Sequence, residues 1–182
     1  VFWPPGREST PEVVIPTQIA KLLASDGAAY DQFGASVALA GDTALVGARS
    51  DDDNGDYSGS AYIFTRTENT WAEQAKLLPS DGAAEDRFGS AVALHGDTAL
   101  VGAVYDDDNG QDSGSAYIFT RTGNSWAQQA KLLATDGAED DRFGLSVALD
   151  GDTALVGSQH NDDSDSNSGS AYVFTRTGNS WT

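Results

Sequence analysis

Three acidic loops in the sequence contain the residue types that calcium prefers. They read DDDNG at 51–55, DDDNG at 106–110 and NDDSD at 161–165, so the glycine is missing from the third loop. Calcium binds about six to eight oxygen atoms, mostly from carboxylates and carbonyls, and a glycine helps the loop to wrap around the ion. We therefore predict calcium as a candidate cofactor. The candidate ligands in these loops are Asp51, Asp53, Asn54, Asp106, Asp108, Asn109, Asp163 and Asp165.

A second group of acidic residues precedes each Phe-Gly pair of the sequence. Its candidate metal ligands are Asp26, Asp31, Asp81, Asp86, Asp136 and Asp141. Two interpretations stay open for both groups of acids. They could bind metal, or they could form turns, because Asp and Asn side chains bond to nearby backbone groups and Gly adopts turn conformations.

The sequence offers little that is typical of an enzyme. His95 and His160 are the only imidazoles, and the G-x-S-x-G pattern of a nucleophilic serine is absent. Paired carboxylates could hydrolyse glycosides, but catalysis normally needs one asymmetric site and these acids recur along the chain. We predict that the protein is not an enzyme, with a carbohydrate-active or other hydrolytic domain as the alternative.

The charge balance excludes several classes of partner. Ten Lys and Arg residues against 28 Asp and Glu give a net charge of −18, which repels nucleic acid and anionic membranes. No stretch approaches the roughly 18 consecutive apolar residues of a membrane span. We therefore expect no nucleic-acid partner and no membrane insertion. The chain has no cysteine, so disulfides and thiolate metal sites are excluded.

A repeat of 55 residues organises the chain and positions the acidic loops. Phe33-Gly34 recurs at 88 and 143, Gly47 recurs at 102 and 157, and Trp71 recurs at 126 and 181. A period of this size is typical of proteins built from stacked supersecondary units. The register is never interrupted by an insertion.

Each repeat reads as four antiparallel strands. In the first repeat, FGASVAL at 33–39 alternates apolar residues, GDT at 41–43 is a turn, and ALVGA at 44–48 follows. After the acidic loop, GSAYIFTRT at 59–67 is rich in residues that favour strands, and ENTWAEQAKLL at 68–78 supplies the fourth. A helix is the alternative for WAEQAKLL at 71–78.

Four strands per repeat predict an all-β fold made of β-propeller blades. We place three blades at about 33–78, 88–133 and 143–182, within a region spanning 17–182. Successive links in such a blade alternate between its two ends. The two groups of acids are therefore expected to meet at one face of the propeller.

The pattern DGAAYDQFGASVALAGDTALVGA, followed by DDDNG and SGSAYIF, resembles FG-GAP repeats, the blades of integrin-α-type β-propellers. The resemblance covers 17–182 and implies a secreted or surface module that binds a protein or glycan, as adhesion proteins do. The calcium hairpin of integrin blades lies between the first two strands, and here only LAGDTAL, at 39–45, occupies that link. The chain is thus similar to a bacterial variety, whose ligand the resemblance does not define.

Three blades are too few to close a propeller, which normally has about four to eight. TQIAKLL at 17–23 matches EQAKLL at 73–78, so it supplies a complementary half for the last outer strand. We predict that the blades close only with further blades of a longer chain or with other copies, as a homo-oligomer or a filament. Residues 1–16 contain four of the five prolines and are expected to form an arm or a linker.

Overall fold

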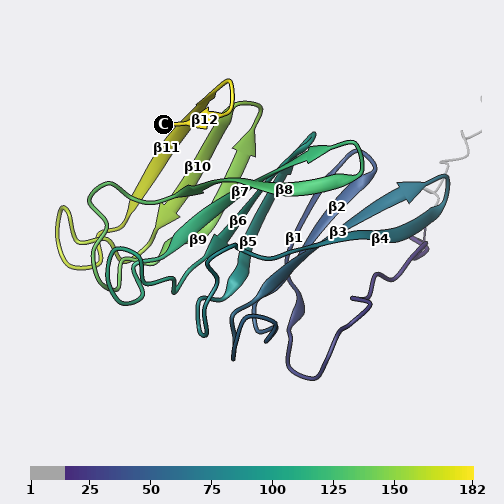
Figure 1. Cartoon of the computed structure of the whole chain (residues 1–182), viewed down its shortest axis with the longest axis horizontal. Helices are drawn as coiled ribbons and strands as arrows, with labels where there is room; N and C mark the ends of the chain where they lie inside the picture. The colour runs from purple at the N-terminus through teal and green to yellow at the C-terminus, as the bar shows by residue number, and fades with distance from the viewer. Residues whose placement is uncertain (1–14) are drawn as a thin grey trace, which may run out of the picture.

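The computed structural model describes residues 15–182, which form three antiparallel four-stranded sheets and no helix. Each sheet corresponds to one repeat, and the three lie in a row from one end of the molecule to the other (Figure 1). The predicted all-β fold with four-stranded repeats is confirmed, and the segment with a helical alternative, 71–78, lies mostly in a strand. The part of the predicted arm in 1–14 lies outside the described residues.

The first two blades have complete outer strands, and the third does not. The strands of the first blade are β1 (Phe33–Ala40), β2 (Thr43–Ala48), β3 (Ser60–Thr67) and β4 (Thr70–Leu77). Those of the second are β5 (Phe88–His95), β6 (Thr98–Ala103), β7 (Ser115–Thr122) and β8 (Ser125–Leu132). Those of the third are β9 (Phe143–Asp150), β10 (Thr153–Ser158), β11 (Ser170–Thr177) and the two-residue β12 (Ser180–Trp181).

Each blade packs one face against its neighbour. We call the face with Tyr117 and Phe119 the front face of the second blade, and the face with Leu100 and Ile118 its back face; equivalent residues define the faces of the other blades. The front face of the second blade buries its aromatic rings against Leu45 and other back-face residues of the first. The third blade packs on the second in the same way. The core is therefore divided into layers between blades.

The Phe-Gly and Val-Gly motifs allow the blades to approach each other closely. Gly89 has φ of 87°, in the left-handed region that glycine tolerates best. A side chain at Gly47 would collide with the carbonyl oxygen of Gly89 in the next blade, and Gly102 meets Gly144 in the same way. The preceding Phe88 is fully buried. The Phe-Gly element therefore packs between blades.

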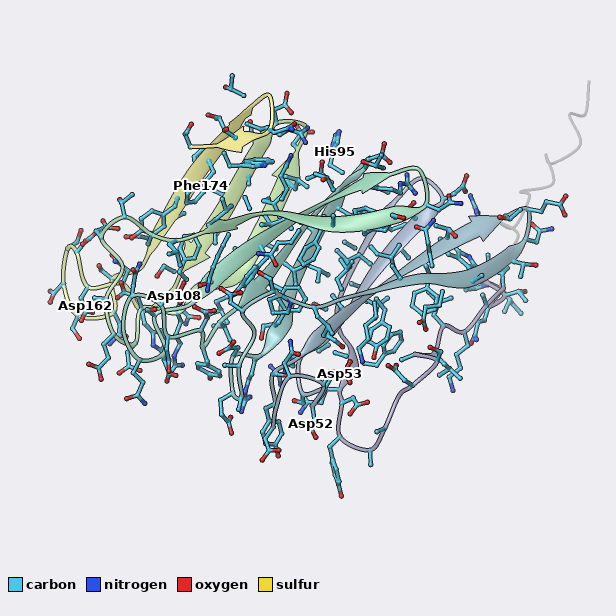
Figure 2. All side chains as sticks on the ribbon, viewed as in Figure 1. Asp52, Asp53, His95, Asp108, Asp162 and Phe174 are labelled. Atoms are coloured by element: carbon cyan, nitrogen blue, oxygen red, sulfur yellow. The ribbon has the colours of Figure 1, made fainter. Side chains whose placement is uncertain are left out.

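The acidic loops line one edge of the molecule. Asp52, Asp108 and Asp162 lie along this edge in Figure 2, whereas His95 lies at the opposite edge. This arrangement follows from the antiparallel order of each sheet, because the second-to-third links all emerge at the same end. Across residues 15–182 we find no helix long and apolar enough to cross a membrane.

Candidate functional site

A lysine lies at the centre of the acidic residues in the first blade. The ammonium of Lys76 is 2.8 Å from Asp26 Oδ2, 3.0 Å from Asp51 Oδ2 and 2.6 Å from Asp53 Oδ2. The Tyr62 hydroxyl is 2.8 Å from Asp26 Oδ1 and 3.0 Å from Asp51 Oδ2. A lysine ammonium has three hydrogens to donate, so the three carboxylates use its full capacity.

The second blade repeats this cluster one period later. Lys131 Nζ lies 2.8 Å from Asp81 Oδ2, 2.9 Å from Asp106 Oδ2 and 2.7 Å from Asp108 Oδ2. The Tyr117 hydroxyl donates to Asp106 Oδ2 at 2.8 Å. The side chain of Asp106 is 4% exposed, so its charge depends on these partners rather than on water. We call these two groups the lysine clusters.

Strand pairing brings the members of each cluster together. Lys76 on β4 is directly opposite Tyr62 on β3, and Lys131 on β8 is opposite Tyr117 on β7. Directly paired residues point to the same face, so lysine and tyrosine lie side by side. The ammonium of Lys76 lies 5.1 Å from the centroid of the Tyr62 ring, which adds a cation–π contact.

The clusters keep their lysines charged. Burial disfavours a charged ammonium, but the hydrogen bonds of Lys76 to Asp26 and Asp53 outweigh it and raise the pKa of Lys76 above its ordinary value. In the second cluster, burial alone would lower the pKa of Lys131. The hydrogen bonds of Lys131 to carboxylates, with the largest effect from Asp108, outweigh burial and raise this pKa. The hydrogen bond from Lys76 lowers the pKa of Asp26.

The third blade has the acidic residues but no lysine among them in the part of the chain that the structure describes. The equivalent of Lys131 would be position 186, which is not part of this sequence. Asn161 replaces the buried aspartate and is 2% exposed; its amide donates to the Tyr172 hydroxyl at 3.2 Å. Partial loss of water and the charge of Asp136 together raise the pKa of Asp163. Burial, followed by the hydrogen bond with Asp136, raises the pKa of Tyr172 to about 12.

Other predicted ligands take part in turns. Asp86 and Asp141 accept the backbone N–H of Ala83 and Ala138 at 2.7 and 2.8 Å, three residues earlier in each case. Asp31 accepts the N–H of Ala28 in the same way. These are the contacts that the turn interpretation predicts.

The remaining loop residues are also held by local bonds. The Asn54 and Asn109 N–H groups donate to Ser58 and Ser113 Oγ, both at 3.1 Å. Asp165 accepts the N–H of the next residue at 2.8 Å and makes no contact that joins it to Asp136 or Asp163 among those observed in residues 15–182. Asp165 is thus not joined to Asp163, the other candidate of the third loop, by any contact observed in residues 15–182.

The geometry of the first two clusters is that of an ion pair network rather than of an open metal site. The lysine ammonium lies at the point toward which the carboxylates converge. Within residues 15–182, no group of three or more His, Cys, Asp or Glu side chains has an arrangement that could hold a metal ion. Calcium binding by the acidic loops stays a prediction.

Comparison with known proteins identifies the repeat. The FG-GAP repeat model matches three times, at 16–64, 71–119 and 126–174. The chain belongs to the FG-GAP repeat family. A solved structure of Sqt1 from Saccharomyces cerevisiae is similar at 10% identity and a TM-score of 0.48, covering 82% of this chain and 33% of that one. A search of curated proteins gave no match.

The FG-GAP unit does not coincide with one sheet. The match at 71–119 begins in the outer strand β4 of the first blade and ends in β7 of the second. The match at 16–64 likewise begins before the first strand of its blade. Its first residues lie in no strand of the structure. In the FG-GAP register, residues 17–23 therefore correspond to an outer strand of a blade that would precede the first.

The sequence interpretation missed the lysine and the tyrosine of each lysine cluster. It considered acidic residues only, because they are the usual ligands of calcium. The missed signal is the repeat itself, since Lys21, Lys76 and Lys131 recur at intervals of 55, as do Tyr62 and its equivalents.

Tryptophan and arginine link neighbouring FG-GAP blades at the edge opposite the acidic loops. Trp126 Nε1 donates to Gln74 Oε1 at 3.0 Å, and Trp181 Nε1 donates to Gln129 Oε1 at 3.1 Å. Arg176 donates to Thr98 Oγ1 in the preceding blade at 3.1 Å. Each repeated arginine also pairs with a carboxylate of its own blade; the pairs are Arg66 with Asp42, Arg121 with Asp97, and Arg176 with Asp152.

Proposed function

We propose that this chain is a non-enzymatic structural or binding module that completes a propeller by associating with copies of itself. One observation carries the proposal: apolar residues that are buried between blades have exposed equivalents at both ends of the row, on the back face of the third blade and on β1 at the front face of the first. On the back face, Leu100 is 0% exposed, whereas the equivalent Leu155 of the third blade is 43% exposed. On the front face, Leu94 is 9% exposed and the equivalent Leu39 of the first blade is 67% exposed.

The two exposed faces are complementary because they are the two halves of one repeated interface. The back face of the third blade can receive the front face of another first blade, just as the first blade receives the second. Apolar faces of this kind on a soluble protein normally mark interaction sites. The proposed contact is head to tail, so each copy offers one front face and one back face.

Polar groups at the ends match in the same way. Arg121 lies 3.4 Å from Thr43 Oγ1 of the preceding blade, and Arg176 makes the equivalent contact with Thr98. The first blade offers Arg66, and the third blade offers Thr153, which is exposed. A head-to-tail copy would pair Arg66 with Thr153.

Several features support a non-enzymatic role. In each lysine cluster the ammonium pairs with three carboxylates, so these carboxylates are not free to act as a general acid or base. His95 lies at the opposite edge from these clusters and pairs with Asp150 at 3.3 Å on the surface. We place the protein outside the cell or on its surface, with a protein or glycan as its ligand, from the resemblance of its repeats to adhesion-type blades.

Native mass measurement tests the proposed association. We expect the unchanged protein to have a mass of at least two copies of the 19.0 kDa chain. Leu39→Glu on the front face and Val173→Glu on the back face should each give monomers, because a buried charge without a partner opposes docking. Both residues are exposed in the single copy, at 67% and 63%, so the fold should tolerate the changes.

A mixture of the two variants provides the control for folding. Each variant retains one intact face, so the Val173→Glu front face can bind the Leu39→Glu back face and restore a pair. Thr122→Glu adds the same charge to the exposed end of β7, away from both faces, and should not change the mass. A monomeric unchanged protein, or a mixture that stays monomeric, would contradict the proposal.

A further inference from the structure

Two arginines from successive blades line one pocket at the edge of the molecule that carries the acidic loops (Figure 2). Arg87 directly precedes β5, Arg142 directly precedes β9, and Tyr105 lies in the loop after β6. The pocket has a volume of about 560 Å³, which is within the range of small-molecule sites. It is therefore large enough to hold a small ligand.

Aromatic rings hold both guanidinium groups. The Cζ atom of Arg87 lies 5.1 Å from the centroid of the Tyr105 ring and 5.6 Å from that of Tyr57. The Cζ atom of Arg142 lies 5.3 Å from the centroid of the same Tyr105 ring. A cation–π contact fixes a guanidinium but leaves N–H groups at its edge free to donate. Both arginines can therefore donate to one ligand that lies beside Tyr105.

These two arginines differ from the repeated arginines at the opposite edge. Each of those pairs with a carboxylate, whereas Arg87 and Arg142 form no ion pair within residues 15–182. The Nε–H groups of Arg87 and Arg142 are also shielded from water and have no hydrogen-bond partner in this part of the chain. Buried donors are normally bonded, so two unbonded donors in one pocket point to an acceptor from outside the chain.

Backbone hydrogen bonds between blades fix the walls of the pocket. The Arg87 N–H donates to the carbonyl of Tyr57, and the Arg142 N–H donates to the carbonyl of Asp112, both at 3.1 Å. Arg87 and Arg142 have φ of 55° and 56°, a conformation that a residue other than glycine keeps only where its surroundings hold it. The site is thus formed before a ligand arrives, which lowers the cost of ordering on binding.

The repeats differ at these positions although their strands do not. β2 and β6 both read TALVGA, and β3 and β7 both read SAYIFTRT. The first blade nevertheless has Gln32 and Ser50 where the second has Arg87 and Tyr105. In the described part of the chain, two arginines around a tyrosine therefore occur at one junction between blades. This is expected of a specific binding site and not of an element that the fold requires.

We infer that this pocket binds a glycan that carries a carboxylate, of the uronic acid class. Arginine binds carboxylates through strong, charge-assisted hydrogen bonds that are often bidentate. Glu85, Asp107 and Asp112 line the same pocket, and carboxylate oxygens accept hydrogen bonds from sugar hydroxyls. This inference rests on the proposed binding role and names its site and its class of ligand.

The acidic lining distinguishes a uronate from other anions. The net charge of −18 and the three carboxylates of the pocket repel a phosphate or an acidic peptide, which brings several negative charges together. A uronate carries one negative charge on a ring whose hydroxyls can donate to those carboxylates. A neutral sugar would leave both arginines without an ionic partner.

Titration of small uronides, monitored by NMR, tests the class of ligand. We would add the methyl glycosides of glucuronate, galacturonate and mannuronate to the full chain. Each is compared with its methyl ester, which keeps the ring and removes the charge. At least one uronide should bind about tenfold more tightly than its ester, because a hydrogen bond to a charged group is stronger than one to a neutral group.

Exchange of residues between blades tests the arginines. Arg87→Gln installs the residue of the first blade, and Gln32 already has φ of 56°, so the backbone accommodates this change. Arg87→Gln should weaken uronide binding by about tenfold, leave binding of the ester unchanged and keep the urea midpoint. Arg142→Gln should have the same effects.

Arg49→Gln is the matched control for the loss of charge. Arg49 is exposed in the acidic loop of the first blade and lies outside the pocket. Its equivalent in the third blade is Gln159, so the repeat again supplies the replacement. The variant loses the same charge at the same edge and should bind the uronide as the unchanged protein does.

Binding and native mass separate this inference from the proposed association. Equal affinity for a uronide and its ester, or equal losses in Arg87→Gln and Arg49→Gln, would overturn the assignment of a carboxylate to the arginines. Tighter binding of a tri-aspartate peptide than of any uronide would overturn the glycan. No binding of any uronide would overturn the inference and leave association unaffected. A monomeric protein that binds a uronide through Arg87 and Arg142 would contradict association alone.

Discussion

Lys131 donates to three carboxylates, and one of them, Asp106, is buried. Lys131→Met keeps most of the side-chain packing but leaves that carboxylate without its positive partner. We expect a loss of about 3–5 kcal/mol in the free energy of unfolding, measured by urea denaturation. By contrast, Asp42→Asn breaks an exposed pair with Arg66 and should cost no more than about 1 kcal/mol.

The third blade suggests the control for this experiment. It places Asn161 where the second blade has Asp106, so a neutral amide is compatible with this position. Adding Asp106→Asn to Lys131→Met should therefore recover most of the lost stability. If the double variant is as unstable as Lys131→Met, the lysine acts through packing and not through its charge.

Two aspartates of the second blade respond to acid in opposite directions. Burial raises the pKa of Asp86 to about 6, so its charge destabilises the fold above that pH, and the cost disappears as the pH falls below 6. The pKa of Asp81 is lowered because the hydrogen bond from Lys131 outweighs burial. Asp81 therefore adds stability above the ordinary aspartate pKa, and this is lost as the pH falls through its lowered value.

Unfolding curves across the pH range should show both effects. The urea midpoint should rise from pH 7 to pH 5 and fall below about pH 4. Asp86→Asn should remove the rise and keep the fall, since Asn is neutral throughout and Asp81 is unchanged. A rise of equal size in Asp86→Asn would show that other groups cause it.

Calcium at the acidic loops would have to compete with the lysines. If it binds, the melting midpoint of the unchanged protein rises with calcium and falls with a chelator, because a ligand of the folded state stabilises it. Lys131→Met should increase this rise, since it leaves Asp81, Asp106 and Asp108 without a cation. No shift in either protein would contradict the calcium prediction.

At the scale of the elements, the contact between blades depends on glycines in the second strand of each sheet. Gly102 on β6 meets the carbonyl of Gly144, whereas the equivalent Gly157 on β10 meets only the movable hydroxyl of Ser146. In the Val173→Glu background, which removes association, Gly102→Ala should destabilise the fold by about 1–3 kcal/mol. Gly157→Ala should have a much smaller effect there, measured by urea unfolding.

In the otherwise unchanged protein, the same Gly157→Ala change should act on association. A second copy would bring Gly34 against Gly157 as Gly144 lies against Gly102. The added methyl group should therefore lower the fraction of associated protein without unfolding it. An unaffected native mass would show that copies do not approach through these glycines.

The strands and their order could be predicted from the sequence because the repeat supplies three versions of each pattern. Alternation at 33–39 and the β-branched and aromatic residues at 59–67 define strands, and the turns between them contain Gly and Asp. The Phe-Gly pair could be recognised as a fixed point of the repeat. These features depend on local chemistry and on periodicity, which the sequence displays directly.

The lysine clusters could not be predicted in full, because their members come together only through pairing. Asp26 is 50 residues from Lys76, and their contact depends on the register of β3 with β4 and on the course of the link into the first strand. A list of calcium-type ligands contains the carboxylates but not the cation that neutralises them. Comparing the repeats for every recurring charged residue would have included the lysines.

For the whole molecule, burial is greatest where a blade has a neighbour on both sides. Each strand of the second blade contributes to a core layer, and its Leu100, Ile118 and Tyr117 are fully buried. The first and third blades each share one such layer with a neighbour. The back face of the third blade is exposed at Leu155 and Val173, whereas the front face of the first is exposed along β1 at Leu39 but buried at Val46 and Tyr62. A stack of this kind gains stability from every added neighbour. The proposed association would serve the same purpose as the contacts within the row.

If copies of this three-blade unit associate as proposed, the number of blades limits the number of copies. Propellers close with about four to eight blades, so two copies with three blades each fit this range and three copies exceed it. Because each copy offers one front face and one back face, a ring of two uses both faces twice and leaves none exposed. We expect a mass of two copies that stays constant over a hundredfold range of concentration, measured by light scattering. A mass that grows steadily with concentration would instead indicate an open filament, in which the head-to-tail contact forms but its angle does not return the row to its start.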